Sequence, residues 1–221
     1  MDELLEQLAD CVERGKADRH SPYPKGLKGR DGAAELTRQA LNRAIPASQI
    51  LQKALTAGMN RVGEKFGAGE AFIPDLLMAA QAMKAAVAIL RPHFESGDIQ
   101  PRGTLILGTV AGDLHEIGKN VVRMVLEGDG WRVIDLGVDV NTDAFIAALK
   151  DNPGAILGMS ALLTTTMISM ERSVREIKRR FPGTEIYVGG APLTREFSDK
   201  IGADGTFPEP HSFARHLASK T

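Results

Sequence analysis

Apolar side chains in the first 91 residues recur at the three- and four-residue spacing of amphipathic helices. Four such groups follow one another, with Pro74 suited to the first turn of the last helix. They are Leu4, Leu5, Leu8, Cys11 and Val12; Leu36, Ala40, Leu41 and Ile45; Ile50, Leu51, Leu55, Met59 and Val62; and Leu76, Leu77, Ala80, Met83, Val87 and Leu90. Four helices without strands between them predict a helical bundle over residues 1–91.

Beyond Gly103 the pattern changes to short apolar runs that alternate with helical segments. The expected strands are Thr104–Thr109, Arg132–Leu136, Ala155–Met159, Glu185–Val188 and Gly205–Phe207. The expected helices are Gly118–Glu127, Thr142–Leu149, Met167–Phe181, Thr194–Ile201 and His211–Ser219. Such alternation predicts a parallel sheet with right-handed crossovers, here a flavodoxin-like, Rossmann-like α/β domain over residues 103–221 with strand order 2-1-3-4-5. The fold class is therefore α + α/β. Residues 92–102, broken by Pro92, Gly97 and Pro101, are expected to link the two domains.

Composition limits the classes of function. The chain has 221 residues, 43% of them hydrophobic, which suffices for one large domain or two small ones with separate cores. A formal net charge of −1 argues against nucleic acid as a partner, and the single cysteine, Cys11, excludes an internal disulfide. No apolar run of about 20 residues occurs, and Met1-Asp2-Glu3 lacks the features of a signal peptide. We therefore expect a cytoplasmic protein with no membrane partner.

The most informative motif is Gly112-Asp113-Leu114-His115-Glu116-Ile117-Gly118, directly after the first expected strand. Open α/β sheets bind ligands at this edge, between the first and third strands. Asp113 is close enough in sequence to bond one ring nitrogen of His115, which leaves the other free to bind a metal.

Three other interpretations of these residues are available. A lone Asp-x-His triplet is commonly structural. A phosphate loop is disfavoured because five residues separate Gly112 from Gly118, Asn120 replaces the hydroxyl residue, and Asp113 would repel phosphate. A zinc site fails because Cys11 is alone, and His211 and His216 are spaced to lie on different helical faces.

Small residues stand at the ends of the expected strands, at Gly112, Gly158, Ser160 and the pair Gly189-Gly190. Together, Asp113-x-His115-x-x-Gly118, Ser160-x-Leu162 and Gly189-Gly190 resemble the cobalamin-binding domain of corrinoid methyl carriers and of cobalamin-dependent methionine synthase. The helical half, through Gly58–Gly67, Phe72-Ile73-Pro74 and Met78–Lys84, is similar to the cap domain of the same proteins. The resemblance covers residues 32–220 and departs at Asp18–Asp31, a polar, basic stretch expected to be a loop.

The resemblance implies a role for each motif residue. His115 replaces the benzimidazole of cobalamin as the lower axial ligand of cobalt, and Asp113 and Thr166 extend a hydrogen-bonded chain from it. Ser160 bonds the displaced benzimidazole, Thr164 contacts the corrinoid, and Phe66 and Ile73 shield the methyl group on the upper face. The other cofactor-binding residues implied are Gly112, Leu114, Glu116, Ile117, Gly118, Leu162, Gly189 and Gly190.

The resemblance also implies a function: a corrinoid protein that carries a methyl group from a substrate-specific methyltransferase to a second methyltransferase, with tetrahydrofolate or a thiol as acceptor. The cofactor would cycle between methylcobalamin and Co(I), with a reductive activator as a further partner. Such a chain is a carrier rather than an enzyme acting alone, since it has no barrel of about 250 residues.

Two alternatives remain. A cobalamin-dependent regulator is disfavoured by the short segment before the cap, and an adenosylcobalamin mutase subunit by the methyl-sized cap residues. The methyl donor stays open among methanol, methylamines, aryl methyl ethers and betaines.

Overall fold

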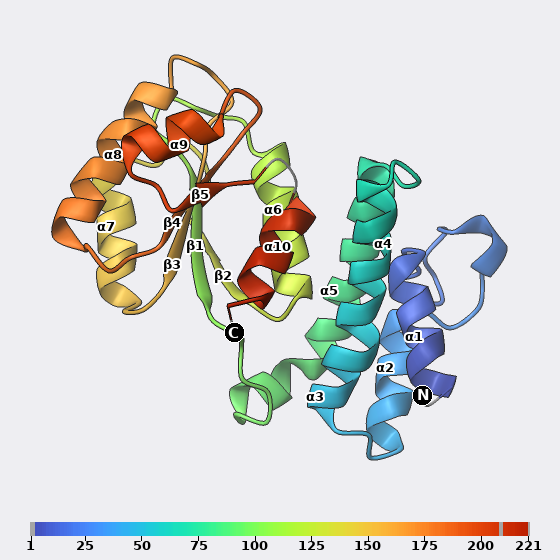
Figure 1. Ribbon diagram of the computed structural model, residues 1–221. Helices are drawn as coiled ribbons and strands as arrows, with labels where there is room; N and C mark the ends of the chain where they lie inside the picture. The colour runs from blue at the N-terminus through green and yellow to red at the C-terminus, as the bar shows by residue number, and fades with distance from the viewer. Residues whose placement is uncertain (1–2, 208–209, 221) are drawn as a thin grey trace. The chain divides into compact units, whose positions relative to one another are not determined.

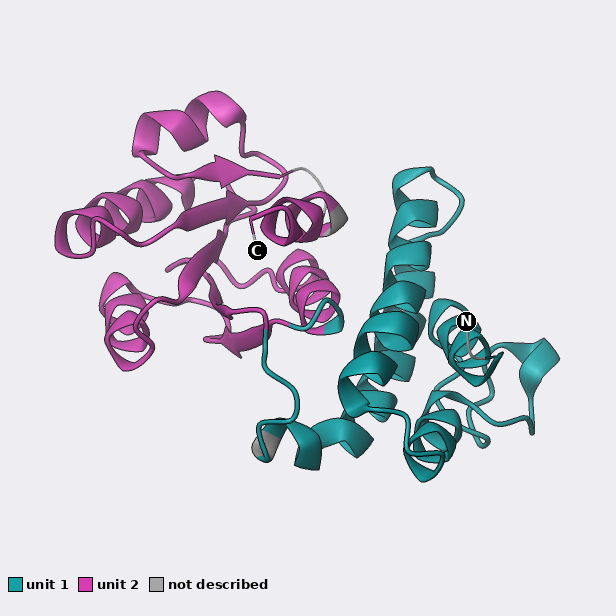
Figure 2. Cartoon of the chain, turned by 60° about the horizontal axis from the view of Figure 1, so that its bottom comes forward, with its two compact units in different colours: residues 1–101, 128–130 teal, residues 102–127, 131–221 magenta. Residues whose placement is uncertain are grey.

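The computed structural model describes residues 3–207 and 210–220 (Figure 1). The predicted domain limits at Met1 and Thr221 lie outside these residues. The chain divides into two compact units, Met1–Pro101 with Gly128–Gly130 and Arg102–Glu127 with Trp131–Thr221 (Figure 2). We call them the helical unit and the α/β unit.

The helical unit contains the four predicted helices. Its elements are α1 (Glu3–Glu13), α2 (Ala33–Asn42), α3 (Ala47–Ile50) continued by the π-helical segment η2 (Leu51–Thr56) and α4 (Ala57–Gly67), and α5 (Ile73–Glu95). The predicted apolar faces form its core, where Leu8, Leu36, Leu55 and Leu90 are at most 6% exposed. Helices α1 and α4 pack closely at Gly58, where a Cβ atom would lie 2.5 Å from the Ala9 carbonyl oxygen.

Helix α5 differs from the prediction at its end. The predicted break at Pro92 is wrong, because the helix runs through Pro92 to Glu95. Proline removes one N–H from the helical ladder, but it is tolerated here within the last turn. By length and composition α5 could also cross a membrane, with a mean hydropathy of 1.5 within Ile73–Phe94, although Asp75, Lys84 and Arg91 interrupt its apolar residues. A core helix passes the same test, and Ala79, Ala82, Met83 and Ala86 of α5 are buried in the bundle.

Residues 18–31 form the predicted loop between α1 and α2, with one 3₁₀ turn, η1 (Lys25–Leu27). A hydrogen bond and an ion pair hold this loop in place. The buried ammonium of Lys16 donates to the Ser21 carbonyl over 2.9 Å, and Arg19 forms an ion pair with Asp31.

The α/β unit has the predicted fold. Five parallel strands lie in the order β2-β1-β3-β4-β5: β1 (Thr104–Thr109), β2 (Arg132–Asp135), β3 (Ile156–Ser160), β4 (Ile186–Gly189) and β5 (Gly205–Thr206). Helices α7 (Thr142–Asp151), α8 (Met167–Arg180) and α9 (Arg195–Ile201) cover one face, and α6 (Ile117–Gly128) and α10 (Pro210–Ala218) cover the other (Figure 1). The elements agree with the predicted ones to within two residues at each end.

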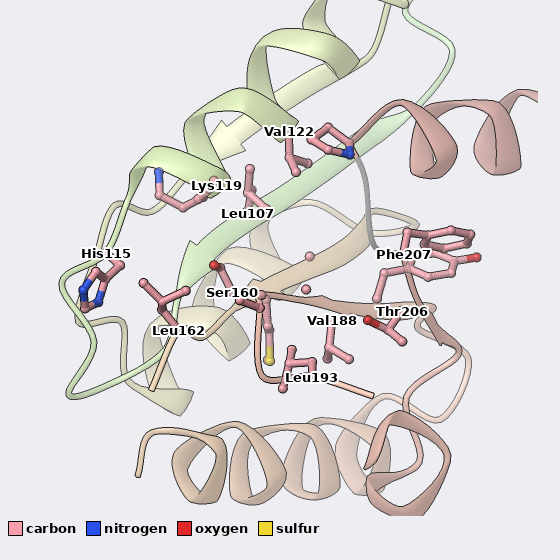
Figure 3. A pocket seen from close by; sticks show the side chains of 18 of the residues that line it. Leu107, His115, Lys119, Val122, Ser160, Leu162, Val188, Leu193, Thr206 and Phe207 are labelled. Atoms are coloured by element: carbon pink, nitrogen blue, oxygen red, sulfur yellow. The ribbon is translucent and has the colours of Figure 1, made fainter. Parts of the chain in front are cut away.

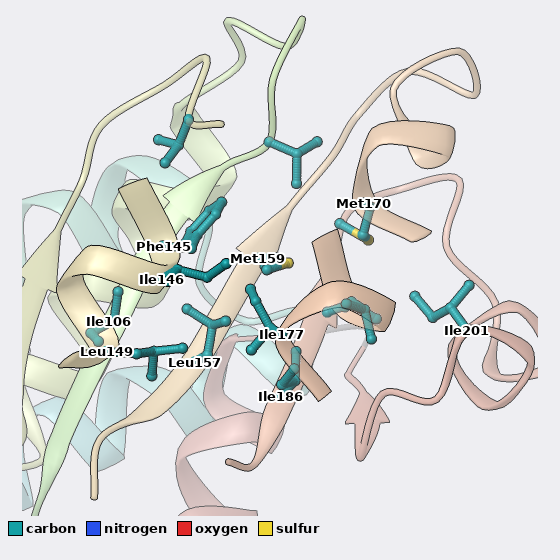
Figure 4. Packing of buried hydrophobic residues seen from close by; sticks show 14 of the residues in the cluster. Ile106, Phe145, Ile146, Leu149, Leu157, Met159, Met170, Ile177, Ile186 and Ile201 are labelled. Carbon is teal, nitrogen blue, oxygen red and sulfur yellow. The ribbon is translucent and has the colours of Figure 1, made fainter. Parts of the chain in front are cut away.

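Successive side chains along each strand point to opposite faces of the sheet, and the two faces have different surroundings. Ile106, Leu157 and Ile186 belong to a continuous core that includes Phe145, Met170 and Ile177 of the helices α7 and α8 (Figure 4). Their neighbours Leu107, Gly158 and Tyr187 point to the opposite face, toward a cavity. One face is therefore filled by side chains, and the other leaves room for a ligand.

Candidate cofactor-binding site

The Gly112–Gly118 loop connects β1 to α6, and hydrogen bonds to neighbouring strand ends help to fix it. Gly112, at φ +85°, donates its N–H to Asp139 Oδ1 over 2.7 Å. The Asp139 N–H donates to the Asp113 carbonyl oxygen over 3.0 Å, and the Thr109 hydroxyl donates to the His115 carbonyl oxygen over 3.0 Å. Sequence analysis missed Thr109 and Asp139. The available signal was their place at the carboxyl ends of adjacent strands, since Asp139 follows β2, which pairs with β1.

Asp113 is fully buried beneath this loop and accepts hydrogen bonds from two segments. Its Oδ1 accepts from Nδ1 of His115 over 2.8 Å and from the His115 N–H over 3.0 Å. Its Oδ2 accepts from the Thr166 hydroxyl over 2.8 Å and from the Leu162 N–H over 2.7 Å, both in the segment after β3. Burial alone would raise the pKa of Asp113, but these hydrogen bonds outweigh it and hold the pKa well below its usual value.

The ionised Asp113 fixes the tautomer of His115. A carboxylate only accepts hydrogen bonds, so Nδ1 of His115 carries the proton, and Nε2 of the neutral ring has its lone pair available. The His115 side chain is 52% exposed, and within residues 3–207 and 210–220 no hydrogen bond to its Nε2 is recorded. Nε2 is therefore placed to bind a metal from outside the protein.

A cavity of about 950 Å³ extends from His115 into the α/β unit, between the sheet and the helices α6 and α10 (Figure 3). His115, Ser160, Gly189 and Gly190 line it at the carboxyl edge of the sheet. Deeper residues come from the middle of the strands, from α6, from α10 and from the segment after β5: Leu107, Gly158, Tyr187, Val122, Phe213 and Phe207.

Glycines keep this cavity open. Gly158 lines it, and a Cβ atom there would lie 2.8 Å from Leu107 Cδ1, which lines the same space. Gly190 has φ +139°, and a Cβ atom there would overlap the Ala161 carbonyl oxygen. Larger residues at either position would narrow the cavity or displace its edge.

Comparisons with known proteins agree with this geometry. Residues 103–215 match the B12 binding domain, and residues 29–91 match a second B12 binding domain model. The chain is 40% identical over 176 residues to trimethylamine corrinoid protein 2 of Methanosarcina mazei, which covers 78% of this chain and 81% of that protein. The chain belongs to the B12-binding corrinoid proteins.

Solved structures of B12-binding proteins have the same architecture. A cobalamin-binding protein from Desulfitobacterium hafniense superimposes with a TM-score of 0.76 at 27% identity, over 98% of both chains. A chain of the methanol:cobalamin methyltransferase complex MtaBC from Methanosarcina barkeri superimposes with a TM-score of 0.81 at 25% identity, over 99% of this chain and 79% of that one. Cobalamin is therefore the cofactor of this corrinoid protein.

The donor set fits cobalamin. Among the residues that the structure describes, no three His, Cys, Asp or Glu side chains gather as a metal site. A corrin ring supplies four cobalt ligands itself, so one free imidazole nitrogen is the protein ligand that the group needs. Leu114 and Ile117, each 71% exposed, and Leu162, 41% exposed, give the apolar surroundings expected for a large ring.

The other predicted site residues lie at different places. Glu116 and Gly118 line the cavity beside His115, whereas Thr164 is exposed and is not among the lining residues. Phe66 of α4 is half-buried and Ile73 at the start of α5 is 45% exposed, both in the helical unit. Phe72, which sequence analysis assigned no role, is 67% exposed next to Ile73.

Lys119, the lysine of the disfavoured phosphate loop, is used inside the corrinoid protein. Its buried Nζ lies 2.7 Å from both carboxylate oxygens of Asp135 on β2 and 3.0 Å from Asn120 Oδ1. Burial opposes ionisation of Asp135, but Lys119 and Arg123 keep the pKa of Asp135 below its usual value. This ammonium joins α6 to β2 and is not available to a nucleotide phosphate.

Proposed function

We propose that this chain is a corrinoid methyl carrier that holds cobalamin through His115, with the benzimidazole of the cofactor displaced into the cavity. The observation that carries the proposal is a histidine whose Nδ1 is bonded to a buried carboxylate and whose Nε2 is free at one end of a deep cavity. When bound, the corrinoid supplies a cobalt that accepts and releases a methyl group.

Each residue near His115 has a separate task in this proposal. Asp113 holds the ring in the orientation and tautomer that a metal requires, and Thr166 holds Asp113. The Ser160 hydroxyl lines the cavity and is available to bond the displaced benzimidazole. With cobalamin bound, His115 would hold the cobalt through Nε2, and the hydrogen bond to Asp113 would raise the basicity of that ligand.

The partners follow from the same role. The relatives named above are a trimethylamine protein and a methanol:cobalamin methyltransferase complex, so we propose a substrate-specific methyltransferase as donor. A second methyltransferase, with tetrahydrofolate or a thiol as acceptor, and a reductive activator complete the proposed system. A cytoplasmic location stays a prediction.

Electron paramagnetic resonance tests the axial ligand. The full chain, labelled with nitrogen-15 histidine and loaded with Co(II) cobalamin, should show coupling from one histidine nitrogen that His115→Ala abolishes. His20→Ala is the matched control, because His20 is exposed and lies in the loop between α1 and α2. Retention of the benzimidazole as the axial ligand in the wild type would refute the proposal.

Substitution of Gly158 tests the place of the cofactor tail. Gly158→Ala should push Leu107 into the cavity and weaken binding of cobalamin more than binding of cobinamide, which has no tail. Gly183→Ala is the control, because a Cβ atom at Gly183 meets nothing within 4 Å. Equal weakening of both ligands in Gly158→Ala would exclude this cavity as the tail site.

Methyl transfer itself is tested with partner enzymes. The loaded protein, given a carbon-14 methyl group, should deliver the label to tetrahydrofolate or to a thiol in the presence of an acceptor methyltransferase. The His115→Ala protein should transfer it far more slowly. Label that stays on the wild-type protein with both classes of acceptor enzyme would argue against a carrier.

A further inference from the structure

The end of the cavity away from His115 is built from aromatic and aliphatic side chains. Rings of Tyr187, Phe207 and Phe213 gather there, with centroids 4.9 Å apart for Tyr187 and Phe213 and 5.3 Å apart for Phe207 and Phe213. Leu107 of β1 and Val122 of α6 complete this surface. We call these five residues the aromatic end; Figure 3 shows Phe207 on the opposite side of the cavity from His115.

Polar groups at the aromatic end are already bonded to protein. The Tyr187 hydroxyl donates to Glu185 over 2.6 Å and accepts from Lys220 Nζ over 2.8 Å, and His216 Nε2 lies 3.2 Å from it. The backbone of Leu107, Gly158 and Tyr187 is in the middle of the sheet, where neighbouring strands pair with it. A ligand that reaches the aromatic end therefore meets mainly ring faces and methyl groups, with the Thr206 side chain beside Phe207.

Several polar side chains of the cavity lie near the carboxyl edge of the sheet, and the buried Lys119 of α6, which also lines the cavity, is bonded to Asp135. His115 and Glu116 are on the loop after β1, and Ser160 ends β3. Thr206 also lines the cavity, and Figure 3 shows it beside Phe207, away from His115. Away from His115 the lining is therefore mainly apolar, with Thr206 as a polar side chain beside Phe207.

We infer that the cavity selects corrinoids by their lower base and prefers a benzimidazole to a purine; this inference rests on the proposed displacement of the base into the cavity. A benzimidazole has an apolar carbocyclic edge and, once off the cobalt, one free ring nitrogen, for which the Ser160 hydroxyl is available. Adenine has an exocyclic amine and several ring nitrogens on the corresponding edges. Each polar group buried there without a partner weakens binding by about tenfold or more.

Equilibrium binding to the full chain tests this selectivity. The probes are cobalamin, the analogue whose lower base is adenine, and cobinamide, which has no base. We expect cobalamin to bind at least about tenfold more tightly than the adenine analogue, with cobinamide also weaker than cobalamin. In the free cofactors benzimidazole leaves cobalt less readily than adenine does. Displacement of the base alone would therefore favour binding of the adenine analogue, which is the opposite of the order we expect. Equal or tighter binding of the adenine analogue would overturn the inference.

A matched pair of substitutions on α6 assigns the selectivity to the aromatic end. Val122→Thr places a hydroxyl in the wall of the cavity and should reduce the preference for cobalamin over the adenine analogue by about threefold or more. Val121→Thr is the control, because Val121 is buried but does not line the cavity. An unchanged preference in Val122→Thr would overturn the assignment, and the wild-type comparison stands as a test if the variant fails to fold.

Failure of the inference differs from failure of the proposed function. Co(II) resonance of the bound adenine analogue and of cobinamide reports whether His115 is the axial ligand whatever the order of affinities. Histidine coordination with no base preference would overturn only the selectivity. Retained coordination by the benzimidazole of bound cobalamin would overturn both.

Discussion

Asp113 is a single side chain that joins two loops and a histidine. Its two oxygens accept from His115 on one side and from Leu162 and Thr166 on the other. The same carboxylate therefore fixes the metal-binding ring and ties the segment after β3 to the segment after β1. Changes at this residue should affect the ligand and the local backbone together.

Asp113→Asn should weaken cobalamin binding by about 10- to 100-fold, because an amide no longer provides two accepting oxygens and leaves the tautomer of His115 unspecified. Binding is measured by titration of the unliganded chain followed by absorbance. Asp151→Asn, at an exposed position at the end of α7, is the control and should bind as the wild type does. Unchanged cobalamin affinity in Asp113→Asn would show that Asp113 does not support His115 as a metal ligand.

Gly190→Ala should lower the free energy of unfolding by about 2–4 kcal/mol, because the new Cβ atom overlaps Ala161 and the φ of +139° is strained for alanine. Urea denaturation measures the change. Gly183→Ala, in a turn with free space around the new atom, should change stability by less than about 1 kcal/mol. Similar free energies of unfolding for the two variants would show that the segment after β4 accommodates the new Cβ atom without loss of stability.

The sequence predicts contacts between side chains that are close along the chain better than contacts made by folding. Asp113 and His115 are two residues apart on one turn, so their hydrogen bond could be expected from spacing alone. Asp139 could not be assigned to Gly112 in the same way, since 27 residues separate them and only the pairing of β1 with β2 brings them together. The bonds of Lys119 to Asp135 depend on the same pairing.

At the scale of elements, the pairing of Lys119 with Asp135 joins helix α6 to strand β2. Lys119→Met should lower the free energy of unfolding by about 2–3 kcal/mol at neutral pH, since among residues 3–207 and 210–220 Asp135 would keep Arg123 alone as a cationic partner. Urea denaturation again measures it. Lys150→Met, on the exposed end of α7, is the control.

The effect of Lys119→Met should depend on pH in a defined direction. The pKa of Asp135 in the folded chain is below its ordinary value of 3.8, so the stabilisation is complete above that value and is lost as the pH falls through the folded pKa. The difference between wild type and Lys119→Met should therefore shrink below about pH 4. A difference that grows on acidification would contradict this account of the pair.

The strands and helices of the α/β unit were predictable because hydrophobic alternation and turn residues mark them locally. The end of α5 was not, because Pro92 is a local signal against a helix, which the last turn of α5 tolerates. The π-helical form of η2 was not either, because the residues Leu51–Thr56 have the same helical spacing as an α-helix. In the sequence, the only sign of the cavity was the presence of small residues at the ends of the expected strands, such as Gly158 and Gly190. Its aromatic end depends on Phe207 and Phe213, which lie beyond the recognised motifs.

At the scale of the whole molecule, His115 and all the described residues that line the cavity belong to the α/β unit. A fragment of residues 102–221 should therefore fold and bind cobalamin with histidine coordination, and the matching His115→Ala fragment should not show that coordination. Circular dichroism and Co(II) resonance measure the two properties. A folded fragment that binds no cobalamin would show that the helical unit contributes directly to retention of the cofactor.

The size of the cavity has a consequence for the life of the protein in a cell. Side chains leave a cavity on one face of the sheet, so the α/β unit gains stability from an apolar group that enters it. A ligand that binds only the folded chain stabilises it by about 2.7 kcal/mol at a hundred times its dissociation constant. Turnover of the protein should then follow vitamin supply: chains made when corrinoid is scarce are degraded sooner, and abundance is adjusted without a change in transcription.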